Sequence, residues 1–225
     1  MDKKPTVFGV FLYDGTEPID LATFGVLSMA RRILPEITLH TIAPKSGITT
    51  LANGLRVVAD FDIWSAPYID VLIVTGGPGW SEQAKTPEVL KFIRRCAHQT
   101  LLVSVCTGSM ILAASGVMDG KSATTKHEIM PPEIPPAKIM RQTYSQVDVR
   151  HSSLVAYDKI ITGGGVTLCI DTMLYVLEEL FGRPLAAETA RILEYKRAWA
   201  ANLEQLPPII IDDMAQPSSP PPLRP

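Results

Sequence analysis

Apolar and polar positions along the chain fall into two alternating patterns. Short runs of branched, aliphatic and aromatic residues predict buried strands at residues 6–12, 37–43, 71–74 and 101–105. Other segments place apolar residues at helical spacing and predict helices at residues 19–34, 87–97, 107–114 and 185–201. Residues 159–182 repeat the order, with a strand, a run of three glycines and a long helix.

This strand-then-helix order predicts the architecture. Parallel neighbours in a sheet need crossover connections long enough to hold a helix, and the predicted helices have that length. We therefore expect an α/β fold with a doubly wound, mostly parallel sheet and helices on both faces, which is a three-layer sandwich. Ligands of such folds bind outside the carboxyl ends of the strands.

Two proline-rich segments interrupt the pattern. Residues 127–138 carry four prolines, and we expect a loop over one edge of the sheet because proline lacks the N–H that a helix interior or central strand requires. Residues 204–225 are expected to form an extended or disordered tail, least ordered over its last ten residues. The chain is thus predicted to hold one domain, residues 1–203, a size that a single core supports.

Composition narrows the class of ligand and the location. Lys and Arg number 21 and Asp and Glu number 23, so the chain offers no field that attracts nucleic acid or an anionic membrane surface. No apolar stretch approaches the roughly 20 residues of a membrane span, and the start lacks the pattern of a signal peptide. We expect a cytoplasmic protein that binds a small molecule of little charge.

The sequence motifs support neither a metal site nor a nucleotide site. Three cysteines at unrelated spacings, Cys96, Cys106 and Cys169, predict neither a disulfide framework nor a CxxC zinc site. The histidines show no HExxH spacing, so no metal is expected. The glycine runs lack GxGxxG and P-loop spacing, which leaves a nucleotide site unsupported.

Cys106 occupies a different position from the other two cysteines. The stretch "SVCTG" places it between a predicted strand and helix, with the small residues Ser104 and Gly108 beside it, as in a nucleophile elbow. Unpaired N–H groups and the partial positive charge of a helix N-terminus favour the thiolate, so the position predicts a lowered pKa. Burial as a small apolar side chain is the alternative, and it is our interpretation of Cys96 and Cys169.

Glycine turns follow the predicted strands at the edge where Cys106 is expected. The backbone N–H groups of Gly76 and Gly77, and the turn at Gly164, are candidates to hold a developing negative charge. The alternative is that these glycines only permit tight turns.

An acidic residue stands out in "EPIDLATF", where Asp20 lies between two apolar residues at a predicted helix start. It either caps or balances the helix N-terminus, or it is a partly buried acid with a raised pKa that holds a proton near the thiolate. Glu17 competes for the second role. His127, beside the proline-rich segment, is a further candidate to enter the site or else a solvated loop residue.

Four motifs in order resemble those of the ThiJ/PfpI superfamily, which is related to the class I glutamine amidotransferases. They are "EPIDL", "VTGGPG", "SVCTGSMILAASGVMDGKSATT" and "ITGGGVTLCIDTMLYVLEELFG". The resemblance covers about residues 5–195 and implies a flavodoxin-like sandwich. Within the superfamily the chain is most similar to isocyanide hydratases and to the amidotransferase-like domains of AraC-type regulators.

For individual residues, the resemblance implies that Cys106 is the nucleophile, Asp20 the acid beside it and Thr107 the residue that follows the nucleophile, with Gly77 in an anion-binding turn. The thiolate would attack the isocyanide carbon, the acid would protonate the adduct, and water would release an N-formamide without any cofactor. Many such relatives are dimers, so a homodimer is expected.

The chain departs from the family pattern at two places. The family's "TTH" is here Thr124-Thr125-Lys126, with His127 one position later. After "LEY", where the hydratases continue with a proline-rich apolar run, the segment "KRAWAANLEQLPP" first extends the helix. The first change affects which side chain can pair with the thiol. The second affects the surface of the pocket or of a partner interface.

Three functions follow from these observations. The first is a cysteine-dependent hydratase or hydrolase of a small electrophile, with an isocyanide as first candidate. The second is a ligand-sensing module, which would need a separate DNA-binding partner because the residues after Leu185 are few and proline-rich. The third is a redox or carbonyl-stress protein in which Cys106 oxidises to a sulfinate.

Overall fold

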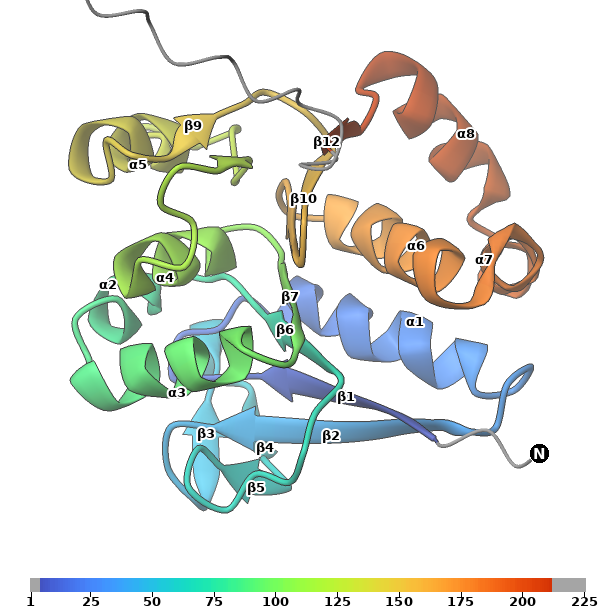
Figure 1. Ribbon diagram of the computed structural model, residues 1–225, viewed down its shortest axis with the longest axis horizontal. Coiled ribbons are helices and arrows are strands. Elements are labelled where there is room, and N and C mark those ends of the chain that lie inside the picture. The colour runs from blue at the N-terminus through green and yellow to red at the C-terminus, as the bar shows by residue number, and fades with distance from the viewer. Residues whose placement is uncertain (1–4, 212–225) are drawn as a thin grey trace, which may run out of the picture.

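The computed structural model describes residues 5–211 and contains an eight-stranded sheet (Figure 1). The strand order is β12-β10-β11-β7-β6-β1-β2-β5, and only the pair β10–β11 is antiparallel. The mostly parallel sheet of the prediction is therefore confirmed. The strands of this sheet are β1 (Thr6–Phe11), β2 (Ile37–Ala43), β5 (Phe61–Asp62), β6 (Val71–Val74), β7 (Leu101–Ser104), β10 (Leu154–Tyr157), β11 (Ile160–Gly163) and β12 (Ile209–Ile211).

Helices lie on both faces of the sheet and are joined by shorter elements. The α-helices are α1 (Ala22–Ala30), α2 (Trp80–Gln83), α3 (Pro87–Ala97), α4 (Gly108–Ser115), α5 (Pro136–Thr143), α6 (Leu168–Phe181), α7 (Arg183–Ile192) and α8 (Lys196–Gln205). The 3-10 helices are η1 (Pro18–Leu21) and η2 (Ala52–Gly54), and two small sheets pair β3 (Ile48–Thr50) with β4 (Arg56–Val58) and β8 (Ser122–Ala123) with β9 (Asp148–Val149).

Side chains alternate across the sheet and build one core on each face. In β6, Leu72 and Val74 pack with residues of α3, α4 and α5, whereas Val71 and Ile73 pack with residues of α1, α6 and α7. Figure 1 shows the same division, with α3 and α4 on one side of the sheet and α1 and α6 on the other. These two cores make the expected three-layer sandwich.

The strand order places a crevice where the prediction expected it. From β1 the chain winds to β2 on one side and to β6, β7 and β11 on the other, so the order reverses between β1 and β6. The four parallel strands β1, β6, β7 and β11 end at the same edge. Ligands of open α/β sheets bind at this kind of edge.

The prediction of one continuous helix at residues 185–201 is wrong. It is two helices, α7 and α8, separated at residues 193–195, where Glu194 has a φ of 56°. The break lies beside a buried carboxyl group on α6: Asp171 accepts hydrogen bonds from the Tyr195 hydroxyl at 2.8 Å and from the Asn202 amide at 3.1 Å. A buried polar group needs such partners, and the turn at residues 193–195 directs α8 so that Tyr195 and Asn202 both reach it.

The proline-rich segments differ in part from the prediction. Residues 136–138, expected in a loop, begin helix α5, because proline is well suited to the first helical turn, where its missing N–H has no partner to lose. In the predicted tail, α8 continues to Gln205 and β12 is extended and pairs with β10. The last ten residues, expected to be least ordered, lie outside the described residues.

Between residues 5 and 211, no helix combines the length and the apolar character that a bilayer crossing requires.

Two helical glycines give a matched test of the packing at the turn before α4. A Cβ at Gly108 would lie 2.1 Å from the Val74 carbonyl oxygen, whereas a Cβ at Gly25 in α1 meets nothing within 4 Å. Gly108→Ala is expected to lower the free energy of unfolding by about 1–3 kcal/mol. Gly25→Ala is expected to raise it by roughly 0.5–1 kcal/mol. Urea denaturation measures both, and equal effects would contradict the close approach of α4 to β6.

Candidate active site

Cys106 lies at the sharp turn between β7 and α4. Its φ is 53°, in the left-handed region that residues other than glycine rarely adopt. The turn is held on both sides, because the Cys106 N–H donates to the Gly164 carbonyl at 3.0 Å and the Val105 N–H donates to the Val74 carbonyl at 3.1 Å. A strained turn that its surroundings hold in place is the geometry of a nucleophile elbow.

The Asp20 side chain is fully buried and caps neither η1 nor α1. Its Oδ2 accepts a hydrogen bond from the Gly76 N–H at 2.6 Å, and its Oδ1 has no hydrogen-bond partner among the described residues. Burial raises the pKa of Asp20 to about 7, against the opposing Gly76 hydrogen bond, and the charge of Glu17 adds to the rise. Asp20 therefore carries a proton for part of the time at neutral pH.

Gly76 brings this acid and the thiol together. A Cβ on Gly76 would lie 2.8 Å from the Cys106 Cβ and 2.4 Å from the Thr107 N, so only glycine fits between the β6 loop and the elbow. The same residue binds Asp20 through its N–H. The carboxyl and the thiol are thus held against one glycine, 56 residues along the chain from the acid.

The pKa of the Cys106 thiol is raised, whereas the helix N-terminus predicted a lowered value. Burial raises this pKa to about 12 and the charge of Asp20 adds to the rise, while the Thr107 N–H, the Lys126 ammonium and the Thr107 hydroxyl lower it. The helix N-terminus acts in the predicted direction, but desolvation is larger. Because adjacent negative charges repel, the thiolate forms most readily when Asp20 is protonated.

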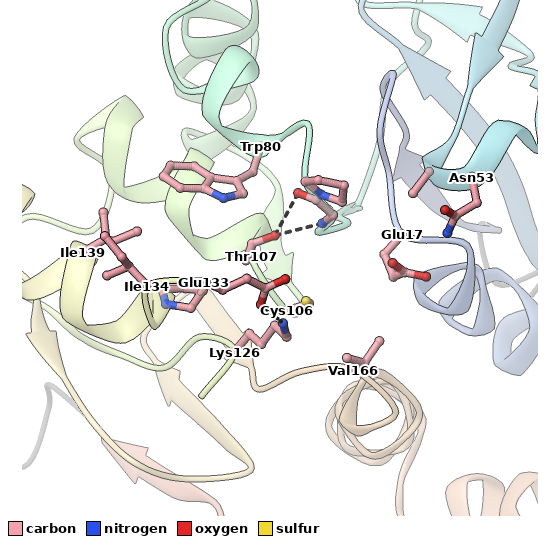
Figure 2. A pocket seen from close by; sticks show the side chains of 14 residues that line it. Glu17, Asn53, Trp80, Cys106, Thr107, Lys126, Glu133, Ile134, Ile139 and Val166 are labelled. Carbon is pink, nitrogen blue, oxygen red and sulfur yellow. Dashed lines mark hydrogen bonds and ion pairs between the residues drawn. The ribbon is translucent and has the colours of Figure 1, made fainter. Parts of the chain in front are cut away.

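The glycine N–H groups that were candidates for anion binding already have partners within the protein. Gly76 donates to Asp20, Gly77 donates to the Thr107 hydroxyl at 2.8 Å, and Gly164 donates to the Ser153 carbonyl at 2.8 Å. The Thr107 hydroxyl in turn donates to the Gly77 carbonyl at 3.2 Å, as the dashed lines in Figure 2 show. These N–H groups hold the loops together, so the predicted anion-binding role is not available to them here.

A cavity of about 530 Å³ opens above the elbow and has two unlike walls. Figure 2 shows Trp80, Ile134 and Ile139 on one side, Glu17 and Asn53 on the other, and Cys106 between them. The residues that line it are Glu17, Ala52, Asn53, Gly77, Pro78, Trp80, Cys106, Thr107, Lys126, Glu133, Ile134, Pro136, Ile139 and Val166. A small molecule with an apolar substituent fits such a pocket.

Lys126, and not His127, lies beside the thiol. The His127 Nε2 is 3.0 Å from the Thr124 hydroxyl, and its ring packs against that of His151 in a tilted arrangement, with centroids 4.3 Å apart. His127 is not among the residues that line the cavity. Glu17, the competitor of Asp20, lines the cavity opposite and is more exposed than Asp20, so the two acids occupy different environments.

The sequence patterns do not point to Trp80, Glu133 or Ile134, which line the cavity. Trp80 follows the "GGPG" turn, and Glu133 and Ile134 belong to the proline-rich segment, for which the sequence predicts only a loop. The "TGGG" turn, by contrast, is expected at the edge where Cys106 lies. At Gly165 a Cβ would lie 3.2 Å from the Cys106 Sγ, so glycine is needed there to leave room for the sulfur.

Comparison with known proteins agrees with this geometry. The sequence pattern of the DJ-1/PfpI family matches residues 9–179. An isonitrile hydratase of Pseudomonas putida is 31% identical over 195 residues, which cover 84% of this chain and 78% of the hydratase. The HTH-type transcriptional regulator GbdR of Pseudomonas aeruginosa is 28% identical over 201 residues, which cover 87% of this chain but only 52% of the regulator.

Among solved structures, a THiJ/PfpI family protein from Pseudomonas syringae superposes with a TM-score of 0.74. The alignment covers 91% of this chain and 88% of that protein, at 22% sequence identity. The likeness confirms the flavodoxin-like fold expected from the motifs.

The contacts of Asp20 predict a pH-dependent change in thiol reactivity. Above about pH 7 the ionised Asp20 opposes the thiolate, so Asp20→Asn should speed alkylation of Cys106 by iodoacetamide about tenfold, a change of one pKa unit. Below that pH the gain should shrink, because protonated Asp20 no longer carries charge. Peptide mass spectrometry of the Cys106 peptide gives the rate.

Glu17→Gln is the matched control, because Glu17 also lines the cavity but is not among the charges that shift the Cys106 pKa. Its rate should stay within about twofold of the wild type, less than a third of a pKa unit. A larger effect from Glu17 than from Asp20 would assign the acid role to Glu17.

Proposed function

The chain belongs to the DJ-1/PfpI family, and from this premise we propose that it is a cysteine-dependent hydratase of a small, weakly charged electrophile. The observation that carries the proposal is that a strained, buried thiol at the cavity and a buried acid of raised pKa are held against the same glycine. Thiol chemistry of this kind needs a nucleophile and a proton source held together, and Gly76 holds both.

An isocyanide is the substrate that we propose first. The similarity to a protein named isonitrile hydratase supports it, as does the apolar wall formed by Trp80, Ile134 and Ile139, which suits an alkyl or aryl substituent. An isocyanide is uncharged overall, which agrees with a cavity whose charged residues are two acids and one lysine.

The reaction uses the residues in two stages. With Asp20 protonated, the Cys106 thiolate forms a bond to the isocyanide carbon, and that carbon takes the Asp20 proton to give a thioimidate. Water then adds to the same carbon and returns a proton to the Asp20 carboxylate. Collapse of this adduct breaks the C–S bond, restores the thiolate and releases the N-formamide. Water is the only co-reactant.

Buried Asp20 suits both proton transfers. A carboxyl with a pKa of about 7 gives up a proton and takes one back with similar ease at neutral pH, which is the condition for efficient general acid–base catalysis. Its unpaired Oδ1 is the atom free to carry the proton.

We also propose that the protein acts as a homodimer in the cytoplasm.

A ligand-sensing role is the second candidate. It is supported by the similarity to the regulator GbdR, of which this chain spans about half the length. The same cavity would then bind a small molecule without turnover, and a DNA-binding partner would respond to the ligand-bound form of this chain.

Turnover separates the two proposals. The wild-type protein should convert an alkyl or aryl isocyanide to its N-formamide, and Cys106→Ala should reduce the rate to the uncatalysed background because the adduct cannot form. Cys96→Ala is the matched control, since this half-buried thiol lies in α3 and not in the cavity. Formamide is followed by liquid chromatography. Binding of isocyanides by calorimetry with no product across a varied panel would contradict the hydratase and favour the sensor.

A further inference from the structure

Lys126 is the one positively charged side chain among the described residues that line the cavity. Its side chain is 24% exposed, and its ammonium lies 3.4 Å from the Glu133 carboxylate. Figure 2 shows the end of the Lys126 side chain beside both this carboxylate and Cys106. A charged donor therefore lies near the candidate nucleophile.

The aliphatic part of the Lys126 side chain and the Cys106 sulfur both lie close to Gly165. A Cβ on Gly165 would lie 2.9 Å from both Cβ and Cγ of Lys126 and 3.2 Å from the Cys106 Sγ. The ammonium also lowers the pKa of the Cys106 thiol. Any group bonded to this sulfur comes within reach of Lys126.

The hydration needs a proton donor that the backbone does not supply. When water adds to the thioimidate, negative charge develops on the substrate nitrogen. The N–H groups of Gly76, Gly77 and Gly164 already bind protein acceptors. Asp20 is fully buried and does not line the cavity, whereas Lys126 does, so Lys126 is better placed to meet a substrate nitrogen that extends into the cavity.

We propose that Lys126 is a catalytic residue that donates a proton to the nitrogen of the Cys106-bound intermediate, and that Glu133 is the residue that positions it. This inference rests on the hydratase function proposed above. It assigns a distinct task to the lysine that occupies the position of the histidine in the family's "TTH" motif.

The proton transfers balance. As the water oxygen bonds to the thioimidate carbon, one water proton goes to Asp20 and the Lys126 ammonium gives a proton to the nitrogen, which receives the electron pair of the C=N bond. When the C–S bond breaks, the remaining hydroxyl proton returns to the Lys126 amine. The products are the N-formamide, the thiolate, protonated Asp20 and the Lys126 ammonium, so every group regains its starting state.

Lys126→Met should therefore separate the two stages of the reaction. We expect steady-state turnover of a phenyl isocyanide to fall about 10²-fold, the usual contribution of a proton donor. Formation of the adduct should slow by no more than about tenfold, through the loss of a charge that favours the thiolate. Intact-protein mass spectrometry should then show an accumulated species heavier by one isocyanide molecule, attached at Cys106.

Two further variants distinguish proton donation from charge alone. Lys126→Arg keeps the positive charge but does not release a proton. It should restore the wild-type rate of Cys106 alkylation while turnover stays low. Lys121→Met is the matched control, because Lys121 is 25% exposed and paired with Asp158 at 3.9 Å but lies outside the cavity. Its turnover should match the wild type. Glu133→Gln should lower kcat less than Lys126→Met, with recovery in Glu133→Asp.

The outcomes identify which proposal fails. Wild-type turnover together with unchanged turnover in Lys126→Met overturns the role of Lys126 alone. Equal slowing of both stages, restored in full by Lys126→Arg, also overturns it, because the lysine would then act only on the thiolate. No isocyanide turnover by the wild type overturns the hydratase and the role of Lys126 together. Slow turnover with an accumulated adduct supports both.

Discussion

The site depends on one constraint, which is that an ionised carboxyl opposes ionisation of the thiol that is buried against the same glycine. Burial raises the pKa of both Asp20 and Cys106 because it removes water from each, and the charge of Asp20 raises the pKa of Cys106 further. Loss of the Cys106 proton is therefore favoured while Asp20 is protonated. Under the function proposed above, the nucleophile and its proton source become available in that same state.

The fold supplies the geometry for this constraint by close backbone approach. Four parallel strands end at one edge, and their turns meet at distances that only glycine allows. Gly76 lies against the elbow, Gly108 against the end of β6, and Gly165 against the sulfur. Hydrogen bonds between these turns hold Cys106 at a positive φ. The sheet thus stores strain at the reacting residue, and the two cores on either face balance its cost.

The chemistry that is particular to this chain lies in loops outside the sheet. Lys126 follows strand β8, and Glu133 and Ile134 come from the proline-rich segment that precedes α5. These residues line the cavity together with Cys106. A family fold fixes the position of the nucleophile, while loops of this kind choose the substrate and complete the reaction.

The sequence by itself determined the mostly parallel sheet, the glycine turns and the elbow at Cys106, because hydrophobic period and turn chemistry are local properties. It also singled out Asp20 by its apolar neighbours. Tertiary structure alone decided that Asp20 binds Gly76, that burial outweighs the helix N-terminus at Cys106, and that Lys126 lines the cavity in place of His127. It likewise divided the predicted helix at residues 193–195, beside the hydrogen bond from Tyr195 to buried Asp171. Desolvation and hydrogen bonding between distant segments depend on what packs around a group, and no local pattern encodes that.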